Sequence, residues 1–229
     1  NITNVIYGRD VGYSVEKISF DKDVESISAT KIRKSMNISP VENEVSIAER
    51  NKRNNHVGGV LWLTGLSASG KTTIASKVER KLFDKGYNIY MLDGDNLRDG
   101  LNSNLGFSDQ DRNENIRRAS EVANILAESG FIVIASFITP TKQDREIAKS
   151  NNKTKFYEVY ISASIKKCEE RDPKGLYKKA RLGEIKDFTG ISAAYDEPKN
   201  PDLTIDTETL SEIESSDILS KYIEKNFPI

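Results

Sequence analysis

The sequence predicts an α/β fold in which a central parallel sheet is covered by helices on both faces. From residue 57 onward, short apolar segments alternate with segments of helical periodicity, and this alternation is typical of parallel sheets. The first apolar segment runs into a glycine-rich loop and then into a helix, as strands that end at a ligand site do. The 229 residues suffice for one such domain with a small attachment, whereas two full domains would be cramped.

Five strands and five helices follow one another along this part of the chain. The strands are expected as short apolar runs at residues 60–63, 88–92, 131–137, 156–161 and 203–205. The helices are expected between them and after the last strand, at residues 71–85, 110–129, 142–150, 165–171 and 208–226. The second helix carries its apolar residues at helical spacing, from Ile116 to Ala127, and Ser108 is its candidate N-cap.

Composition limits the function classes. Lys and Arg total 34 against 35 Asp and Glu, so no overall field attracts the chain to nucleic acid or to a membrane surface, and neither partner is expected. No apolar run is as long as a membrane span, and the lone Cys168 has no intrachain partner, which together indicate a cytoplasmic location. His56, the single histidine, argues against Cys/His zinc sites and His-activated nucleophiles, and it is expected to be a solvated loop residue.

A complete phosphate-binding loop follows the first predicted strand. Residues 65–73 read GLSASGKTT, which places glycines where the backbone turns tightly, Lys71 where it reaches β- and γ-phosphates, and Thr72 where it ligates Mg²⁺. The next helix adds the positive end of its dipole. A glycine- and serine-rich connector is the bland alternative, but strand, loop and helix occur in the required order. The motif predicts a P-loop NTPase-type three-layer sandwich that binds a nucleoside triphosphate with Mg²⁺.

Charged residues cluster where the second strand ends. The run at 93–98 reads DGDNLR, so two carboxylates and Arg98 lie at a strand end. Beside a bound Mg²⁺-triphosphate, a carboxylate such as Asp95 can hold metal-bound water or accept a hydroxyl proton, and an arginine can bind an anionic substrate. A solvated Asp-Gly turn explains the same residues.

Three further segments favour a site over a simple turn. Phe107 stands between Gly106 and the Ser108 cap, where its ring suits stacking on a base. The third strand ends in a hydroxyl next to a proline-enforced bend, at residues 136–140. A basic, glycine-punctuated segment at 174–190 has the composition of a lid that closes over phosphates.

Residues 57–207 closely resemble adenylylsulfate kinases (APS kinases). The matching runs are LWLTGLSASGKTT, LDGDNLRDGLN, NLGFSDQDRNENIRR, CEERDPKGLYKKARLGEIKDFTGI and YDEPKNPDLTIDT. The resemblance implies transfer of the γ-phosphate of ATP to the 3′-hydroxyl of adenosine 5′-phosphosulfate (APS), which gives PAPS and ADP in sulfate activation. It also suggests a homodimer.

The resemblance implies a role for each matching position. ATP would be bound by Ala68, Ser69, Gly70, Lys71, Thr72, Thr73 and Arg171, with Mg²⁺ on Thr72. APS would be bound by Asp95, Arg98, Phe107, Arg112, Asn115, Ile138, Thr139, Lys174 and Phe188. Asp95 would position or deprotonate the attacking hydroxyl, and the catalytic set would be Lys71, Asp95 and Thr139.

The chain departs from the family at several positions. Thr139 replaces a serine that is able to carry phosphate, although direct in-line transfer needs no phospho-enzyme. Asp187 replaces a common glycine and brings negative charge near an anionic substrate, and Ser192 replaces an aspartate. These departures motivate one alternative, a catalytically weak nucleotide-binding partner module. A second alternative is another small P-loop kinase that acts on a nucleoside or a sugar acid.

Residues 1–55 are expected to form an N-terminal extension and residues 56–229 the kinase domain. Residues 1 to about 37 resemble the C-terminal end of an HxGH-type nucleotidylyltransferase, with Ser28 and Thr30 in its ISxTxxR turn. The histidine motif itself is missing, so this segment is expected to be structural or inert. The resemblance predicts fusion to, or association with, a nucleotidylyltransferase or ATP sulfurylase. The segment at 36–55 reads as a linker or a surface helix.

Overall fold

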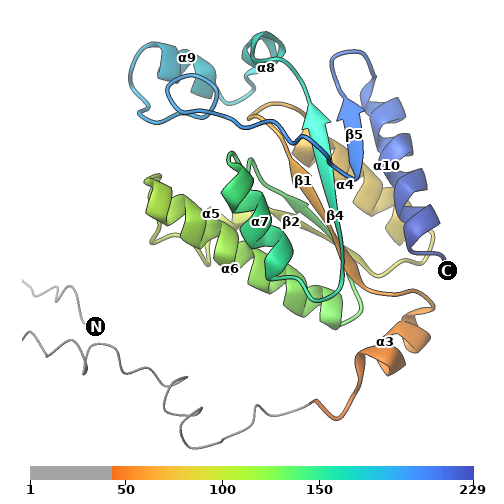
Figure 1. The fold of residues 1–229 in the computed structure, drawn as a ribbon. Helices are drawn as coiled ribbons and strands as arrows, with labels where there is room; N and C mark the ends of the chain where they lie inside the picture. Colours follow the sequence, from red (N-terminus) through yellow and green to blue (C-terminus); the bar gives the residue numbers. More distant parts are fainter. Residues whose placement is uncertain (1–42) are drawn as a thin grey trace, which may run out of the picture. The chain divides into compact units, whose positions relative to one another are not determined.

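The computed structural model describes residues 43–229, and residues 45–229 form one compact unit. Its core is a sheet of five parallel strands in the order β2-β3-β1-β4-β5 (Figure 1). The predicted parallel α/β class is therefore confirmed. The strands are β1 (Gly59–Thr64), β2 (Ile89–Asp93), β3 (Ile132–Ser136), β4 (Lys155–Ser162) and β5 (Leu203–Asp206). The nucleotidylyltransferase-like run at residues 1–37 lies outside the described residues.

Eight helices are described in residues 43–229. They are α3 (Ile47–Asn54), α4 (Lys71–Phe83), α5 (Gly94–Asp99), α6 (Asp109–Glu128), α7 (Lys142–Ser150), α8 (Ile165–Arg171), α9 (Leu176–Arg181) and α10 (Glu212–Asn226). All five predicted helices are present. The short helices α5 and α9 were not predicted, because each spans only six residues and has no room for a periodic pattern.

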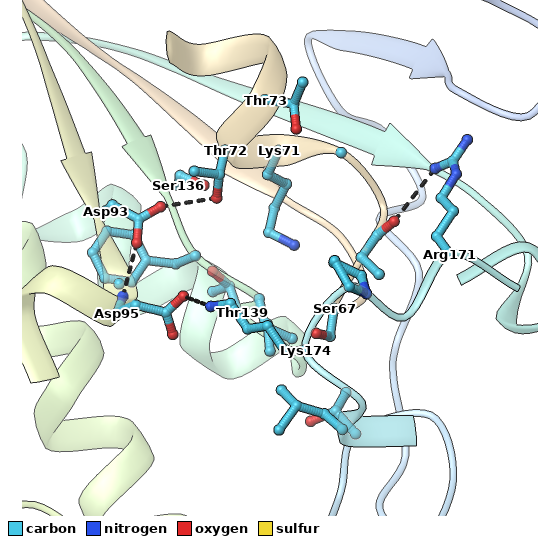
Figure 2. Close-up of a pocket in the computed structure, with 18 of the residues that line it drawn as sticks. Ser67, Lys71, Thr72, Thr73, Asp93, Asp95, Ser136, Thr139, Arg171 and Lys174 are labelled. Atoms are coloured by element: carbon cyan, nitrogen blue, oxygen red, sulfur yellow. Dashed lines mark hydrogen bonds and ion pairs between the residues drawn. The ribbon is translucent and has the colours of Figure 1, made fainter. Parts of the chain in front are cut away.

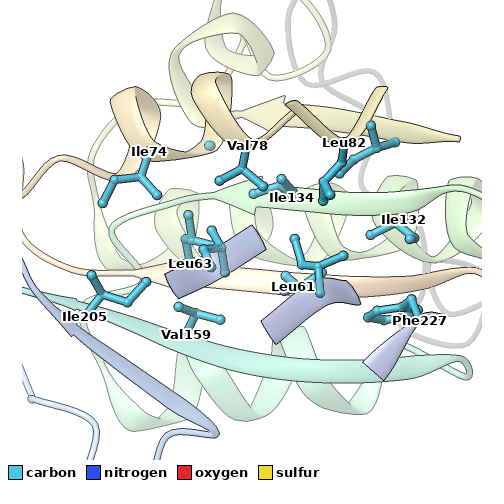
Figure 3. Packing of buried hydrophobic residues seen from close by; sticks show 14 of the residues in the cluster. Leu61, Leu63, Ile74, Val78, Leu82, Ile132, Ile134, Val159, Ile205 and Phe227 are labelled. Atoms are coloured by element: carbon cyan, nitrogen blue, oxygen red, sulfur yellow. The ribbon is translucent and has the colours of Figure 1, made fainter. Parts of the chain in front are cut away.

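The sheet is the middle of three layers, and β1 shows why. Its side chains alternate between the two faces, as a strand requires. Leu61 and Leu63 pack with α4 and α10 in one apolar cluster, shown in Figure 3. Val60 and Trp62 pack in a second cluster with the apolar stripe of α6, including Ala119. β1 is consequently buried on both faces, which matches its continuous apolar sequence.

Helix starts follow local capping chemistry. The Ser108 hydroxyl accepts the Asp111 N–H, which confirms Ser108 as the N-cap of α6. The last helix begins at Glu212 and not at residue 208, because Ser211 and Glu214 form a capping box there. The predicted start was therefore four residues early, and the residues before Ser211 form a turn that contributes to the cavity described below.

The prediction that His56 is solvated was wrong. His56 is 3% exposed, and its ring lies 5.5 Å from that of Tyr87. Its Nε2 accepts the Asn88 N–H at 3.0 Å, while Nδ1 lies 2.9 Å from the Val57 carbonyl oxygen. Both ring nitrogens thus join the start of β1 to the start of β2. The polar sequence around His56 gave no sign of this distant partner.

Helix α3 is part of the compact unit. The side chain of Asn51 accepts the Gly58 N–H, and the side chain of Asn54 donates to the Gly130 carbonyl at 2.9 Å. The surface-helix interpretation of this segment is therefore the one that holds. The compact unit starts at residue 45, before the expected boundary at residue 56, because these side chains attach α3 to it.

Candidate active site

The carboxyl ends of the parallel strands share one edge of the sheet, and a cavity of about 820 Å³ opens there. The phosphate loop, the ends of β2 and β3, and the segment from α8 to α9 all contribute to its wall. Every residue predicted for the site lines this cavity except Ser69, which is a fully buried residue of the phosphate loop. The tertiary structure thus brings together residues that lie more than a hundred positions apart in the sequence.

The phosphate loop has the backbone that its glycines predict. Gly70 has φ +103° and forms the N-cap of α4. At Gly65, a Cβ would stand 2.5 Å from the Ile161 carbonyl oxygen, so only glycine fits between β1 and β4. The loop leads into α4, whose first N–H groups have no partner within the helix. The arrangement is a cradle for an anion.

Lys71 is a buried cation held by the loop itself. Its ammonium donates to the carbonyl oxygens of Gly65 at 2.9 Å and Leu66 at 2.7 Å. Burial lowers the pKa of Lys71 to about 8, and the carboxylates of Asp93 and Asp95 oppose this shift. The ammonium is therefore preorganised but weakly solvated, and an incoming phosphate would provide a stronger acceptor than either carbonyl.

Asp93 is a site residue that the predicted set omitted. Its Oδ2 accepts the Thr72 hydroxyl at 2.9 Å, and its Oδ1 accepts the Asp95 N–H at 2.9 Å (Figure 2). Asp93 thereby connects the phosphate loop to the N-terminus of α5. The signal was present in the DGD run, but the sequence does not distinguish which carboxylate faces the loop.

Asp95 and Lys174 form an ion pair across the cavity (Figure 2). Lys174 belongs to the segment between α8 and α9, so the pair links the end of β2 to the predicted lid. Both side chains are more than half exposed, with 58% for Lys174 and 68% for Asp95, which makes the pair weak and easily exchanged for a ligand. The pair therefore marks where a charged substrate would enter.

The two aromatic residues predicted for the site, Phe107 and Phe188, line the same cavity with different partners. The Arg98 guanidinium lies 4.4 Å from the ring centre of Phe107, which is 63% exposed. The ring of Phe188 packs edge-on against Tyr177 at 5.0 Å. An exposed aromatic ring beside an arginine is a surface that a planar ligand can cover.

Arg112 joins the two loops that carry these rings. Its guanidinium donates to the carbonyl oxygen of Phe107 at 2.9 Å, to the hydroxyl of Thr189 at 3.0 Å, and to the carbonyl oxygen of Asp187. Asp187 adopts φ +53°, a left-handed conformation that glycine would adopt without strain. Arg112 is thus well placed for an anion but is engaged by the backbone in this state.

Two residues that depart from the family pattern, Ser192 and Thr139, accept hydrogen bonds from other parts of the protein. The Ser192 hydroxyl accepts the Phe188 N–H at 2.9 Å, so serine here stabilises the turn that carries the ring. Thr139 is 1% exposed, and its hydroxyl accepts the indole N–H of Trp62 at 2.9 Å. A buried, engaged hydroxyl is a poor phosphate acceptor.

Arg145 on α7 contacts the part of the cavity wall that contains Thr139. It is 9% exposed, and its guanidinium donates to the carbonyl oxygen of Asp196 at 2.7 Å. Its Nε lies 3.0 Å from the carboxylate of Glu158 on β4. Desolvation raises the pKa of Glu158, and the charge of Arg145 opposes that shift. The pair connects α7, β4 and the segment that follows the lid.

Arg171 lies at the end of α8 beside the phosphate loop. Its guanidinium donates to the Ala68 carbonyl oxygen at 3.3 Å and to the Thr207 hydroxyl at 3.1 Å. The Thr207 hydroxyl also donates to the Ser69 carbonyl at 2.8 Å. Leu210 and Glu212 extend the cavity wall beyond Thr207. Arg171 was predicted for the site, whereas Thr207, Leu210 and Glu212 were not, because the turn after the last strand and the start of α10 show no motif of their own.

A phosphate loop after the first strand and an acceptor pocket over the same edge of a parallel sheet are the attributes of P-loop kinases, and this chain is one of them. The family model for adenylylsulphate kinase matches residues 57–206. The chain belongs to the adenylylsulfate kinase family.

Relatives and solved structures agree with the family match. The adenylyl-sulfate kinase of Bacillus pumilus is 51% identical over 185 residues, which cover 80% of this chain and 94% of that protein. The adenylyl-sulfate kinase of Staphylococcus carnosus is 50% identical over 192 residues, or 83% of this chain and 96% of that protein. The structure of the Mycobacterium tuberculosis APS kinase in complex with AMPPNP and APS superposes with a TM-score of 0.71 at 47% identity, and covers 73% of this chain and 98% of that chain.

The chain is therefore an enzyme, an ATP-dependent phosphotransferase with an alcohol group as acceptor, and its function is that of an adenylylsulfate kinase. The alternatives of a catalytically weak partner module and of another small P-loop kinase are not favoured. In residues 43–229 no helix is both long and apolar enough to cross a membrane.

Proposed function

We propose that this cavity binds ATP at the phosphate loop and APS on the opposite wall, and that the γ-phosphate passes directly from one to the other. The single observation that carries the assignment is that one cavity of about 820 Å³ contains both the phosphate cradle and the predicted acceptor residues. Two nucleotides bound in one cavity can bring a hydroxyl and a γ-phosphate into line. No phospho-enzyme is required, and Thr139 is assigned to the wall that positions the acceptor.

On the ATP side, we assign Lys71 to the β- and γ-phosphates. The loop from Ala68 to Thr73 would supply backbone N–H groups, and Arg171 would lie against the base. The Lys71 side chain is already buried in the phosphate loop, beside its carbonyl partners. It would therefore exchange these partners for phosphate oxygens without moving far. The charge that develops in the transition state would thus meet a preorganised cation.

Three neighbouring oxygens fit a magnesium ion that arrives with ATP. Thr72 and Asp93 are already paired, and the buried Ser136 hydroxyl beside them has no partner among the described residues. Mg²⁺ keeps most of its waters and uses few protein ligands beside the phosphates, which suits this sparse set. We assign Thr72 as the direct ligand, with Asp93 and Ser136 as acceptors for coordinated water. The ion would neutralise phosphate charge.

On the acceptor side, we assign Asp95 to the 3′-hydroxyl of APS. Its carboxylate would accept the hydroxyl proton as the oxygen attacks. Lys174, now paired with Asp95, would turn to the anionic groups of APS and release the carboxylate for this task. Substrate binding and exposure of the base would thereby be linked.

The remaining acceptor residues would hold the nucleotide. Phe107 and Phe188 would stack on the adenine, and Arg98 would leave the face of Phe107 to make room. Arg112 and Asn115 would bind the phosphosulfate, and Ile138 would complete the wall. Asp187 contributes its carbonyl to Arg112, so its charge need not face the anion.

The proposed reaction is tested by incubating the full chain with ATP, Mg²⁺ and APS and detecting PAPS and ADP directly. Equal amounts of both products are expected only when APS is present. A nucleoside and a sugar acid serve as control acceptors. ADP release with either of them, and none with APS, would contradict the assignment.

ATP affinity is expected to fall as the pH rises through about 8. Burial lowers the pKa of Lys71 to about 8, and ATP binds the protonated ammonium, so the fully charged form is present below that pH and is lost above it. The loss should approach about tenfold per pH unit. Calorimetric titration with ATP between pH 7 and 9.5 measures it. An ATP affinity that does not change with pH up to 9.5 would show that the pKa of Lys71 lies higher than this.

Phe107→Ala is expected to raise the KM for APS by about tenfold and to leave the KM for ATP within about twofold, because a stacked ring contributes about 1–3 kcal/mol per base. Initial-rate kinetics with each substrate varied in turn measure both constants. Ile125→Ala is the matched control, since Ile125 is equally apolar and 59% exposed but does not line the cavity. Equal losses for both substrates would place the Phe107 ring elsewhere.

The wider setting is proposed on the family resemblance alone. We assign residues 56–229 to the kinase domain and residues 1–55 to an extension whose helix α3 is hydrogen-bonded to that domain, and we propose a cytoplasmic homodimer. Fusion to, or association with, a nucleotidylyltransferase or ATP sulfurylase would supply APS next to the enzyme that consumes it. Size-exclusion chromatography with light scattering tests the dimer.

A further inference from the structure

Asn115 lies in the acceptor wall and does not stand alone. It is 6% exposed, belongs to the second turn of α6, and lines the cavity. Its Oδ1 accepts a hydrogen bond from Nδ2 of Asn102 at 2.9 Å. None of the described residues accepts a hydrogen bond from its own Nδ2. The acceptor end of the amide is therefore occupied inside the protein, and the donor end remains for the cavity.

Asn102 is fixed more firmly than its partner. It is 0% exposed and lies in the turn that follows α5, outside the cavity wall. Its backbone N–H donates to the Leu97 carbonyl at 2.7 Å, and its carbonyl accepts the Leu105 N–H at 3.0 Å. The backbone of Asn102 is thus held on both sides, and the bond from its Nδ2 to Asn115 is the one side-chain hydrogen bond that it makes among the described residues, because its buried Oδ1 has no partner there. The loop that follows α5 thereby supplies a hydrogen-bond donor to the Asn115 amide on α6.

The orientation of an amide matters next to an anion. A carboxamide has a donor end and an acceptor end of nearly the same shape. Turned one way, Asn115 donates to a phosphate or sulfate oxygen, and turned the other way it places lone pairs against it. A free side chain would populate both orientations. The orientation that turns the amide oxygen toward the anion loses the hydrogen bond to that charged group.

We propose that Asn102 is a positioning residue that orients the Asn115 amide so that its N–H₂ group faces the phosphosulfate of APS. The inference rests on the proposed function, because it requires APS to lie against Asn115. Asn102 itself touches no substrate. It acts through Asn115, and it selects an anionic ligand on the acceptor side without affecting the ATP side.

The test is a double-substitution cycle on the full chain with Asn102→Leu and Asn115→Ala. Leucine keeps the approximate size of Asn102 but cannot donate. In the otherwise unchanged chain, Asn102→Leu is expected to raise the KM for APS by about tenfold, with the KM for ATP unchanged. In the Asn115→Ala background, the same substitution should change the KM for APS by less than about twofold, because the amide to be oriented is gone.

A second variant keeps the inference falsifiable if leucine prevents folding. Asn102→Asp preserves the shape, and it is assayed across a range of pH, because only the ionised carboxylate, which cannot donate, accepts the Asn115 Nδ2 and turns the Oδ1 toward the substrate. We expect a larger rise in the KM for APS than leucine causes, again only while Asn115 is present. Asp99→Asn, on the neighbouring exposed end of α5, should leave both KM values unchanged.

The outcomes separate this inference from the proposed function. Equal effects of the Asn102 substitutions with and without Asn115, or parallel losses for APS and ATP, would overturn it and leave Asn102 as a packing residue. The same holds if Asn115→Ala leaves the KM for APS unchanged while PAPS still forms. Failure of the unsubstituted chain to form PAPS would instead overturn the proposed function, and this inference with it.

Discussion

Lys71→Ala is expected to fold, to bind ATP more weakly, and to lose phosphoryl transfer by roughly a thousandfold. Lys71 is 8% exposed, and its ammonium is fixed by the carbonyl oxygens of Gly65 and Leu66. Charge that develops on the transferred phosphoryl group would meet this cation in a site with little water, where its effect is largest. Alanine removes the cation, and water admitted in its place must reorganise during the reaction.

Single-turnover rates at saturating ATP and APS measure the loss, and the thermal midpoint checks the fold. Lys81→Ala is the matched control, because Lys81 lies on the same helix α4 but pairs with Asp217 at the surface, away from the cavity. Its rate should equal that of the unsubstituted chain. A rate for Lys71→Ala within about threefold of normal would remove Lys71 from the transition state.

Asp95→Asn is expected to lower the transfer rate by about a hundredfold to ten-thousandfold while the affinity for ATP stays the same. An amide of the same shape cannot take the proton of the attacking hydroxyl. Asp95 is exposed at the mouth of the cavity and contributes nothing to the apolar core, so the fold should survive the change.

Lys174→Ala separates the two tasks of this carboxylate. It breaks the same ion pair but keeps the base, so it should raise the KM for APS and retain a larger share of kcat than Asp95→Asn. Asp99→Asn on α5 controls for a change of charge near the site. If Asp95→Asn and Lys174→Ala lower kcat equally, the loss comes from the broken pair and Asp95 is not the base.

Signals of short range could be read from the sequence. The apolar alternation predicted five strands, and the Ser108 cap and the stripe from Ile116 to Ala127 predicted α6, because capping and periodicity act within a few residues. The phosphate loop was equally local, since its glycines and Lys71 do their work within one turn. Local interactions of this kind can be predicted from the sequence alone.

Other features depended on partners that are distant in the sequence. The burial of His56 depends on the backbone of Asn88, and the engagement of Thr139 depends on Trp62. Lys174 and Asp95 belong to elements that are far apart in the chain, and nothing in the sequence indicates that the two side chains form an ion pair. Helices α5 and α9 are too short for a periodic signal.

The sequence by itself determined the fold class, the phosphate loop and the membership of the kinase family, because each rests on local pattern or on a long specific match. Only the tertiary structure determined which groups the site residues contact. It showed that Lys71 is held by backbone carbonyls, that Asp93 and not Asp95 accepts the Thr72 hydroxyl, and that Asn102 donates a hydrogen bond to Asn115. The physical reason is that hydrogen-bond partners and desolvation are set by the packing of distant strands and helices, and residue order does not specify that packing locally.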